Sequence, residues 1–243
     1  MRMRPLLLLV FLGLPHTLPA GDVTIPLSCR QLVVVETADW RSVTGSLRKF
    51  ERSNRSSPWR QAGPPLPVVV GRRGLAWGAG MHQVHAGAAR KQEGDERAPA
   101  GLFALTTIWG SATAASAGAL RLPYRQARPT TEAVDDPRSA YYNQIVDRQQ
   151  VAPDWRSAEK MLRKDSLYEW VIVVDHNTAG TPGAGSCIFM HRWLGPKRGT
   201  AGCTAMAPEE LLALARWLDA AAHPLLLQLP AEEMRRVENG PAR

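Results

Sequence analysis

Beyond its first twenty residues, the sequence lacks any apolar run long enough to cross a bilayer as a helix. Such a helix needs about 20 consecutive apolar residues, whereas the runs at residues 68–70 and 225–227 have only the length of a strand. This absence excludes a helical membrane protein for the rest of the chain. We therefore expect no stable membrane insertion.

Cysteine is scarce and odd in number, with Cys29, Cys187 and Cys203. No Cys-x-x-Cys pair occurs, and Cys187 and His191 would lie about 13 Å apart on an extended strand, at ~3.3 Å per residue. We expect no metal site, and nothing in the sequence indicates a cofactor. In an oxidising compartment at least one thiol stays free; pairing Cys29 with Cys187 leaves Cys203 free, but the spacing alone leaves that pairing open.

Acidic residues are outnumbered, with 22 Asp and Glu against 30 Lys and Arg, and the formal net charge is +8. Such a balance is compatible with nucleic acid, with an anionic polymer of the cell envelope, or with solubility alone. The basic residues are scattered and no nucleic-acid-binding motif occurs. We therefore exclude a nucleic-acid partner.

Residues 1–20 have the pattern of an export signal. Arg2 and Arg4 give a positive start, residues 6–14 form a short apolar run, and Ala20 is a small residue before a cleavage point. Prolines interrupt the run well before the length of a spanning helix. We predict a signal peptide and hence a periplasmic or cell-envelope protein. The cleavage site itself stays open, because Leu18 is large for its position.

The remaining chain reads as one mainly β domain with peripheral helices, an α+β fold over residues 21–230, followed by a polar tail at 231–243. β-Branched or apolar runs bounded by Pro, Gly or polar residues predict the strands, and amphipathic spacing predicts two helices. The expected strands are 31–36, 67–71, 102–105, 169–175, 186–191 and 225–229; the expected helices are 152–164 and 208–222.

The segment 187–206 (CIFMHRWLGPKRGTAGCTAM) carries the candidate chemistry. It places His191 at the end of an apolar strand, and a glycine-rich loop then leads to Cys203. A cysteine nucleophile acts as the thiolate, and an imidazole within reach takes up its proton. We predict Cys203 as nucleophile and His191 as base. Gly202 allows close backbone approach, and amides beside a nucleophile commonly bind the oxyanion.

This segment resembles the catalytic motif of the L,D-transpeptidase catalytic-domain family, cysteine enzymes that remodel bacterial peptidoglycan. In that family a strand ends in His, and a Ser/Thr-x-Gly-Cys turn, here residues 200–203, presents the nucleophile. Residues 94–103 (GDERAPAGLF) are similar to the family's upstream loop, with Ala98 at the Thr/Ser place. The resemblance covers roughly residues 68–229 and implies a β-sandwich with one helix after the nucleophile loop.

Two positions depart from the common form of the motif, Ser-His-Gly-Cys-Ile/Val-Arg. Ala201 replaces the His and Ala205 replaces the Arg, so this chain lacks the cation that the motif places near the nucleophile. The same segment holds three other cations that are candidates to replace the missing arginine, namely Arg192, Lys197 and Arg198. The departures mark a divergent member of the family.

The resemblance implies an acyltransferase that cross-links peptidoglycan stem peptides through an acyl-enzyme on Cys203. The same thiol chemistry also fits a hydrolase, either an L,D-carboxypeptidase or an amidase, and a non-catalytic wall-binding module is the remaining alternative. We expect Thr200 and Gly202 to shape the oxyanion or substrate site and Trp193 to shape the surroundings of His191. His176 either lines the substrate cleft or is satisfied by backbone groups.

Overall fold

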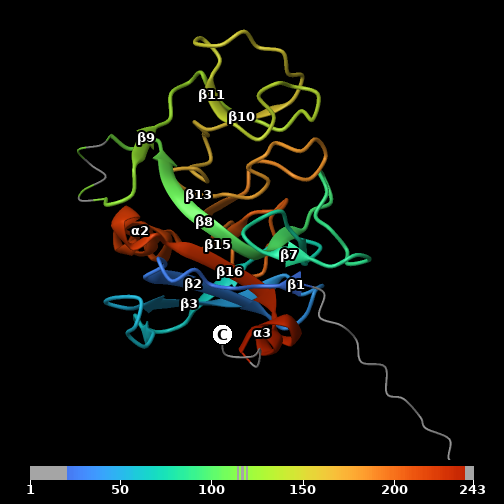
Figure 1. The fold of residues 1–243 in the computed structure, drawn as a ribbon. Coiled ribbons are helices and arrows are strands. Elements are labelled where there is room, and N and C mark those ends of the chain that lie inside the picture. Colours follow the sequence, from blue (N-terminus) through green and yellow to red (C-terminus); the bar gives the residue numbers. More distant parts are fainter. Residues whose placement is uncertain (1–20, 114, 116–117, 119, 239–243) are drawn as a thin grey trace, which may run out of the picture.

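The computed structural model describes residues 21–113, 115, 118 and 120–238. The predicted signal peptide lies outside this range. Strands dominate and the helices lie at the periphery (Figure 1), which confirms the mainly β, α+β fold. The strands of the main sheet are β2 (Gln31–Thr37), β3 (Thr44–Glu51), β5 (Leu66–Val69), β8 (Ala98–Gly110), β13 (Trp170–Val174), β14 (Phe189–Arg192), β15 (Thr204–Met206) and β16 (Leu225–Pro230), with β4 (Arg60–Gln61), β6 (Leu75–Trp77) and β9 (Tyr124–Gln126) attached to them.

The main sheet closes on itself because β8 is long enough to serve two neighbours. Its first half pairs with β16, where Gly101 lies opposite Gln228, and its second half pairs with β13, where Gly110 lies opposite Trp170. From β13 the order continues through β14, β15, β5, β3 and β2 back to β16. The continuous apolar sequences of β2 and β16 match their burial inside this closed structure.

A small separate sheet covers one side of the barrel. Its strands are β10 (Thr131–Val134), β11 (Ile145–Asp147) and β12 (Ala158–Lys160), in the order β11-β10-β12. Figure 1 shows β10 and β11 across β8 from β2 and β3. Ala133 and Met161 pack in one apolar cluster with Val171, Phe189 and Cys203. The small sheet therefore closes over the part of the barrel that holds the predicted nucleophile.

Two helices and two short strands complete the described chain. Helix α2 (Pro208–Trp217) follows the nucleophile segment and packs Leu211, Leu214 and Ala215 into the core, as its amphipathic spacing predicts. Helix α3 (Ala231–Glu238) contacts β16 and β2, and a one-turn η1 (Ala220–Ala222) precedes β16. The strands β1 (Gly21–Asp22) and β7 (Gln83–Val84) pair with each other.

One element differs from the sequence prediction. The expected helix at 152–164 is absent, and β12 occupies its centre. Asp154, near the start of the expected helix, accepts hydrogen bonds from the hydroxyl of Ser139 and the amide of Ala140. Tertiary contacts with the loop after β10 therefore override the local helical pattern. Within the described ranges, no helix has the length and apolar character needed to span a membrane.

Candidate active site

The nucleophile segment forms a tight turn between β14 and β15. The Thr200 hydroxyl donates to the carbonyl of Cys203 at 2.6 Å and accepts from the amide of Gly202 at 3.1 Å. Backbone bonds to Val70 and Arg72 tie Thr200 to the chain after β5. Thr200 and Gly202 thus shape the turn, and an oxyanion at the Gly202 amide would have to displace the Thr200 hydroxyl.

The sulfur of Cys203 lies against the backbone of the neighbouring strand. Cys203 Sγ accepts a hydrogen bond from the amide of Phe189 at 3.3 Å and lies 3.9 Å from the carbonyl oxygen of Cys187. This placement follows from the parallel pairing of β14 and β15, in which Met190 lies opposite Thr204. Cys203 is buried, with 8% of its surface exposed.

The electrostatic surroundings of Cys203 keep it a neutral thiol in this structure. Burial, and to a lesser extent the negative charge of Glu159, raise the pKa of Cys203 to about 12, although the Phe189 amide and Lys91 act to lower it. His191 does not depress this pKa, contrary to the simple expectation that an imidazole near a thiol produces an ion pair. Deprotonation at neutral pH therefore requires a base to accept the proton as the sulfur reacts.

His191 lies on β14, and among the described residues only one of its two ring nitrogens has a hydrogen-bond partner. Its Nδ1 is 2.7 Å from the carbonyl oxygen of Arg192, so Nδ1 carries the proton and Nε2 is the basic nitrogen. Burial lowers the pKa of His191 to about 4, which leaves the imidazole neutral at pH 7. Among the residues described, the structure records no hydrogen bond between His191 and Cys203.

Tyr168 links the two predicted catalytic residues. Its ring lies edge-on to Phe189 and His191, with centroids 5.7 and 5.4 Å away, and it belongs to the apolar cluster of Cys203. Its hydroxyl donates to the carboxylate of Glu159 on β12. The sequence alone indicates neither Tyr168 nor Glu159 as a site residue, because a Tyr before a buried strand and a Glu in an expected helix form no distinguishing pattern.

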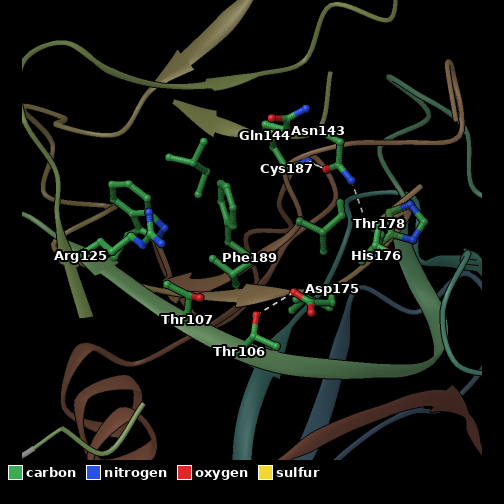
Figure 2. A pocket seen from close by; sticks show the side chains of 15 residues that line it. Thr106, Thr107, Arg125, Asn143, Gln144, Asp175, His176, Thr178, Cys187 and Phe189 are labelled. Carbon is green, nitrogen blue, oxygen red and sulfur yellow. Dashed lines mark hydrogen bonds between the residues drawn. The ribbon is translucent and has the colours of Figure 1, made fainter. Parts of the chain in front are cut away.

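A cleft of about 390 Å³ lies between the small sheet and strands β8, β13 and β14 (Figure 2). Cys187 and Phe189, whose backbone groups contact Cys203 Sγ, line it. The polar and charged groups along its walls come from several segments, namely Thr106, Thr107, Arg125, Asn143, Gln144 and Asp175. Hydrogen-bonding groups therefore line a cleft on one side of β14, and the Cys203 thiol lies behind this strand.

His176 and Trp193 occupy different positions relative to this site. His176 lines the cleft, but both ring nitrogens are used: Nδ1 accepts from the amide of Ala79, and Nε2 donates to the carbonyl of Ala184. Burial lowers the pKa of His176 to about 4. Trp193 is half-buried beyond the end of β14, where its amide donates to Met206. The structure places neither side chain in a recorded contact with Cys203 or His191.

All three cysteines are free and buried, so the pairing of Cys29 with Cys187 does not occur in this structure. Cys29 packs in the main core, whereas Cys187 packs in the separate cluster of Cys203. The fold therefore assigns these two cysteines to different apolar clusters. In the described part of the chain, no group of three or more His, Cys, Asp or Glu side chains is arranged to hold a metal ion.

The comparison with protein families gives one match. The family model for the L,D-transpeptidase catalytic domain matches residues 59–226, which covers β4 to the start of β16 and includes both the nucleophile turn and His191. The match confirms the resemblance inferred from the motifs. No curated protein and no solved structure matches the chain.

Proposed function

Because the chain belongs to the L,D-transpeptidase catalytic domain family, we propose that it is a peptidoglycan acyltransferase with Cys203 as nucleophile and His191 as general base. At family level it is an L,D-transpeptidase-type enzyme that acts on peptidoglycan. The observation that carries the finer proposal is the tautomer of His191: the Arg192 carbonyl holds the proton on Nδ1 and leaves Nε2 free to accept one.

The proposed reaction begins with proton transfer from Cys203 Sγ to His191 Nε2. The sulfur bonds to the carbonyl carbon of the third-position diamino acid of a stem peptide, and the carbonyl oxygen becomes negative. Collapse breaks the C–N bond to the terminal D-alanine, whose amine takes the proton from His191. A thioester between the stem peptide and Cys203 remains.

The thioester is then resolved by an amine of a neighbouring stem peptide. The amine attacks the thioester carbonyl, His191 accepts its proton, and the C–S bond breaks to restore the thiol. Water in place of the amine gives hydrolysis, which is the activity of a carboxypeptidase. We propose the cleft beside β14 as the binding site of the peptide donor, because hydroxyl, amide and charged groups line it. Cys203 and His191 do not line this cleft themselves, and Cys203 lies behind its lining residues Cys187 and Phe189.

The neutral pair of thiol and imidazole supports a reaction in which the proton moves only as the substrate arrives. Burial raises the pKa of Cys203 and lowers that of His191, so the two groups do not form an ion pair at rest. A substrate that displaces the Phe189 amide from the sulfur would free the lone pair for attack. This arrangement protects the thiol from adventitious oxidation.

The direct test is digestion of purified peptidoglycan by the protein lacking residues 1–20, followed by mass analysis of the muropeptides. Dimers linked through two diamino acids, formed by the parent and absent with Cys203→Ala, are the expected result. Cys29→Ser is the matched control, because Cys29 packs in the other core cluster and its sulfur donates to the carbonyl of Gln31, a bond that serine retains.

Other outcomes of the same digestion overturn the proposal in distinct ways. Shortened monomers without new dimers identify a hydrolase. An unchanged muropeptide pattern, together with a Cys203 thiol that resists alkylation, identifies a non-catalytic wall-binding module. Family resemblance also predicts acylation by a carbapenem-type β-lactam, which appears as a mass increase in the parent and disappears in Cys203→Ala.

We further propose that the protein acts outside the cytoplasm, in the periplasm or cell envelope. The charge and apolar pattern of residues 1–20 supports this location. N-terminal sequencing of the protein purified from a cell-envelope fraction tests it. A start near residue 21 is expected, and an intact Met1 in a cytoplasmic fraction contradicts it.

A further inference from the structure

Lys91 is unusual because it is a cation inside the protein. Its side chain is 3% exposed, and no other Lys or Arg is buried among the residues that the structure describes. The ammonium group donates to Asp95 Oδ1 and to the carbonyl of Gln92, both at 2.6 Å. An ammonium group has three hydrogens, so one donor is not used by these two bonds.

The aliphatic chain of Lys91 runs beneath the nucleophile turn. A Cβ built on Gly202 would lie 3.8 Å from Lys91 Cε, and a Cβ on Gly185 would lie 3.0 Å from Lys91 Cγ. Lys91 therefore passes between the loop before β14 and the residue that directly precedes Cys203. Any side chain at Gly185, whose φ is +92°, would press on this packing.

The cations suggested by the sequence for the role of the missing motif arginine lie elsewhere. Arg192 is paired with Glu169 at 3.6 Å, and Lys197 and Arg198 are exposed on the loop before the turn. Ala205, at the place of that arginine, is fully buried in β15. The buried position beside the nucleophile turn is instead filled by Lys91, from the upstream loop.

We propose that the ammonium group of Lys91 stabilises the thiolate of Cys203 during the reaction, in place of the arginine that this chain lacks at position 205. Lys91 is then a positioning residue that acts through Cys203. The inference rests on the proposed function for its role in catalysis, although its effect on the thiol is measurable without peptidoglycan.

The charge on Lys91 acts against an opposing field from the small sheet. The titratable groups around the thiol are Lys91 with its partner Asp95, Glu159, Tyr168, Cys187 and His191. Glu159 raises the pKa of Cys203 and Lys91 lowers it. Buried charges are weakly screened, so removing either charge shifts the fraction of thiolate.

The test is the rate of Cys203 alkylation by iodoacetamide between pH 7 and 10, read from the tryptic peptide 199–216, which holds no other cysteine. At a pH well below the pKa of a thiol, raising that pKa by about 1 lowers the thiolate fraction about tenfold. Lys91→Met should slow alkylation ~3- to 10-fold at every pH in this range. Asp95→Asn, which leaves the ammonium less compensated, should accelerate it ~2- to 5-fold.

The opposite signs separate an electrostatic role from a structural one. Loosening of the fold would expose the thiol and accelerate alkylation in both variants. Lys91→Met combined with Asp95→Asn, which leaves no unpaired buried charge, should behave like Lys91→Met. Lys197→Met, which removes an exposed charge from the same region, should leave the rate within about twofold of the parent.

Superimposable rate profiles for the parent and Lys91→Met, or shifts of the same sign in Lys91→Met and Asp95→Asn, overturn the inference. Its failure is distinguishable from failure of the proposed function. Alkylation that responds to Lys91 in a protein without effect on peptidoglycan refutes the function alone. If Lys91→Met forms new dimers at the parent rate, only the proposed role of Lys91 is refuted and the proposed function stands.

Discussion

His176 and His191 are both buried but differ in how many of their ring nitrogens form hydrogen bonds. Burial lowers the pKa of both to about 4, so both are neutral at pH 7. His176 has both ring nitrogens in hydrogen bonds to backbone groups, whereas His191 has only Nδ1 engaged. A ring nitrogen without a hydrogen-bond partner, more than burial or a depressed pKa, therefore distinguishes the proposed base His191 from the fully bonded His176.

The largest expected effect tests the spare nitrogen directly. His191→Gln keeps a polar side chain of similar length but removes the basic ring nitrogen Nε2. General base catalysis contributes about 10²- to 10⁴-fold, so we expect a loss of that size in the rate of Cys203 acylation by a carbapenem. His85→Gln, at an exposed position, is the control. A loss below tenfold would remove His191 from the reaction.

The lowered pKa of both histidines predicts that the folded protein loses stability in acid. The unfolded chain binds protons below the ordinary histidine pKa of 6.5, whereas the folded chain binds them only near pH 4. The unfolded state therefore holds more protons in this window, and the free energy of unfolding falls as the pH drops from 6.5 to 4. The loss is about 3 kcal/mol for each histidine.

Urea unfolding at pH 7, 5.5 and 4 measures this loss. His176→Phe and His191→Gln should each remove a large part of the dependence on pH in this range, and His82, whose pKa burial also lowers, retains a part in both variants. A free energy of unfolding that is flat between pH 7 and pH 4 in the parent contradicts the neutral, buried state of both rings.

The smallest expected effect concerns the fully bonded histidine. His176→Phe keeps an aromatic ring against Phe103 but leaves the amide of Ala79 and the carbonyl of Ala184 without their partner. Each unsatisfied buried group costs about 1–3 kcal/mol, so we expect the two groups together to cost at least about 2 kcal/mol at pH 7. Acylation per folded molecule should fall far less than in His191→Gln. An equal fall in both variants would erase the distinction between the two histidines.

All six predicted strands overlap strands of the structure, although the strand expected at 186–191 begins only at Phe189. The bounds agree best where the sequence has a continuous apolar run. The runs at 31–36, 169–175 and 225–229 form β2, β13 and β16, because consecutive apolar side chains favour a strand that is buried on both faces. The helix at 208–222 was also found, although α2 ends at Trp217. The segment 152–164 failed because its conformation depends on partners far away in the chain, such as Ser139 for Asp154.

The residues of the candidate site also fall into two groups, those that a local sequence pattern indicates and those that only the folded chain brings together. Cys203 and His191 were identified from one segment, because a nucleophile turn and a strand-end His form a local pattern. Tyr168, Glu159 and Lys91 were not, because they lie 35, 44 and 112 residues before Cys203 in the sequence and meet it only in the folded chain.

The sequence by itself determined the family, the mainly β class and the proposal of Cys203 as nucleophile, since each rests on short-range patterns of residue type and spacing. The tertiary structure alone decided the protonation state of Cys203. Closure of the barrel through β8 and the cover of the small sheet exclude water from Cys203, which makes it a neutral thiol under the opposed fields of Glu159 and Lys91. Burial and the direction of a field are properties of the assembled chain, because they depend on which distant groups surround an atom.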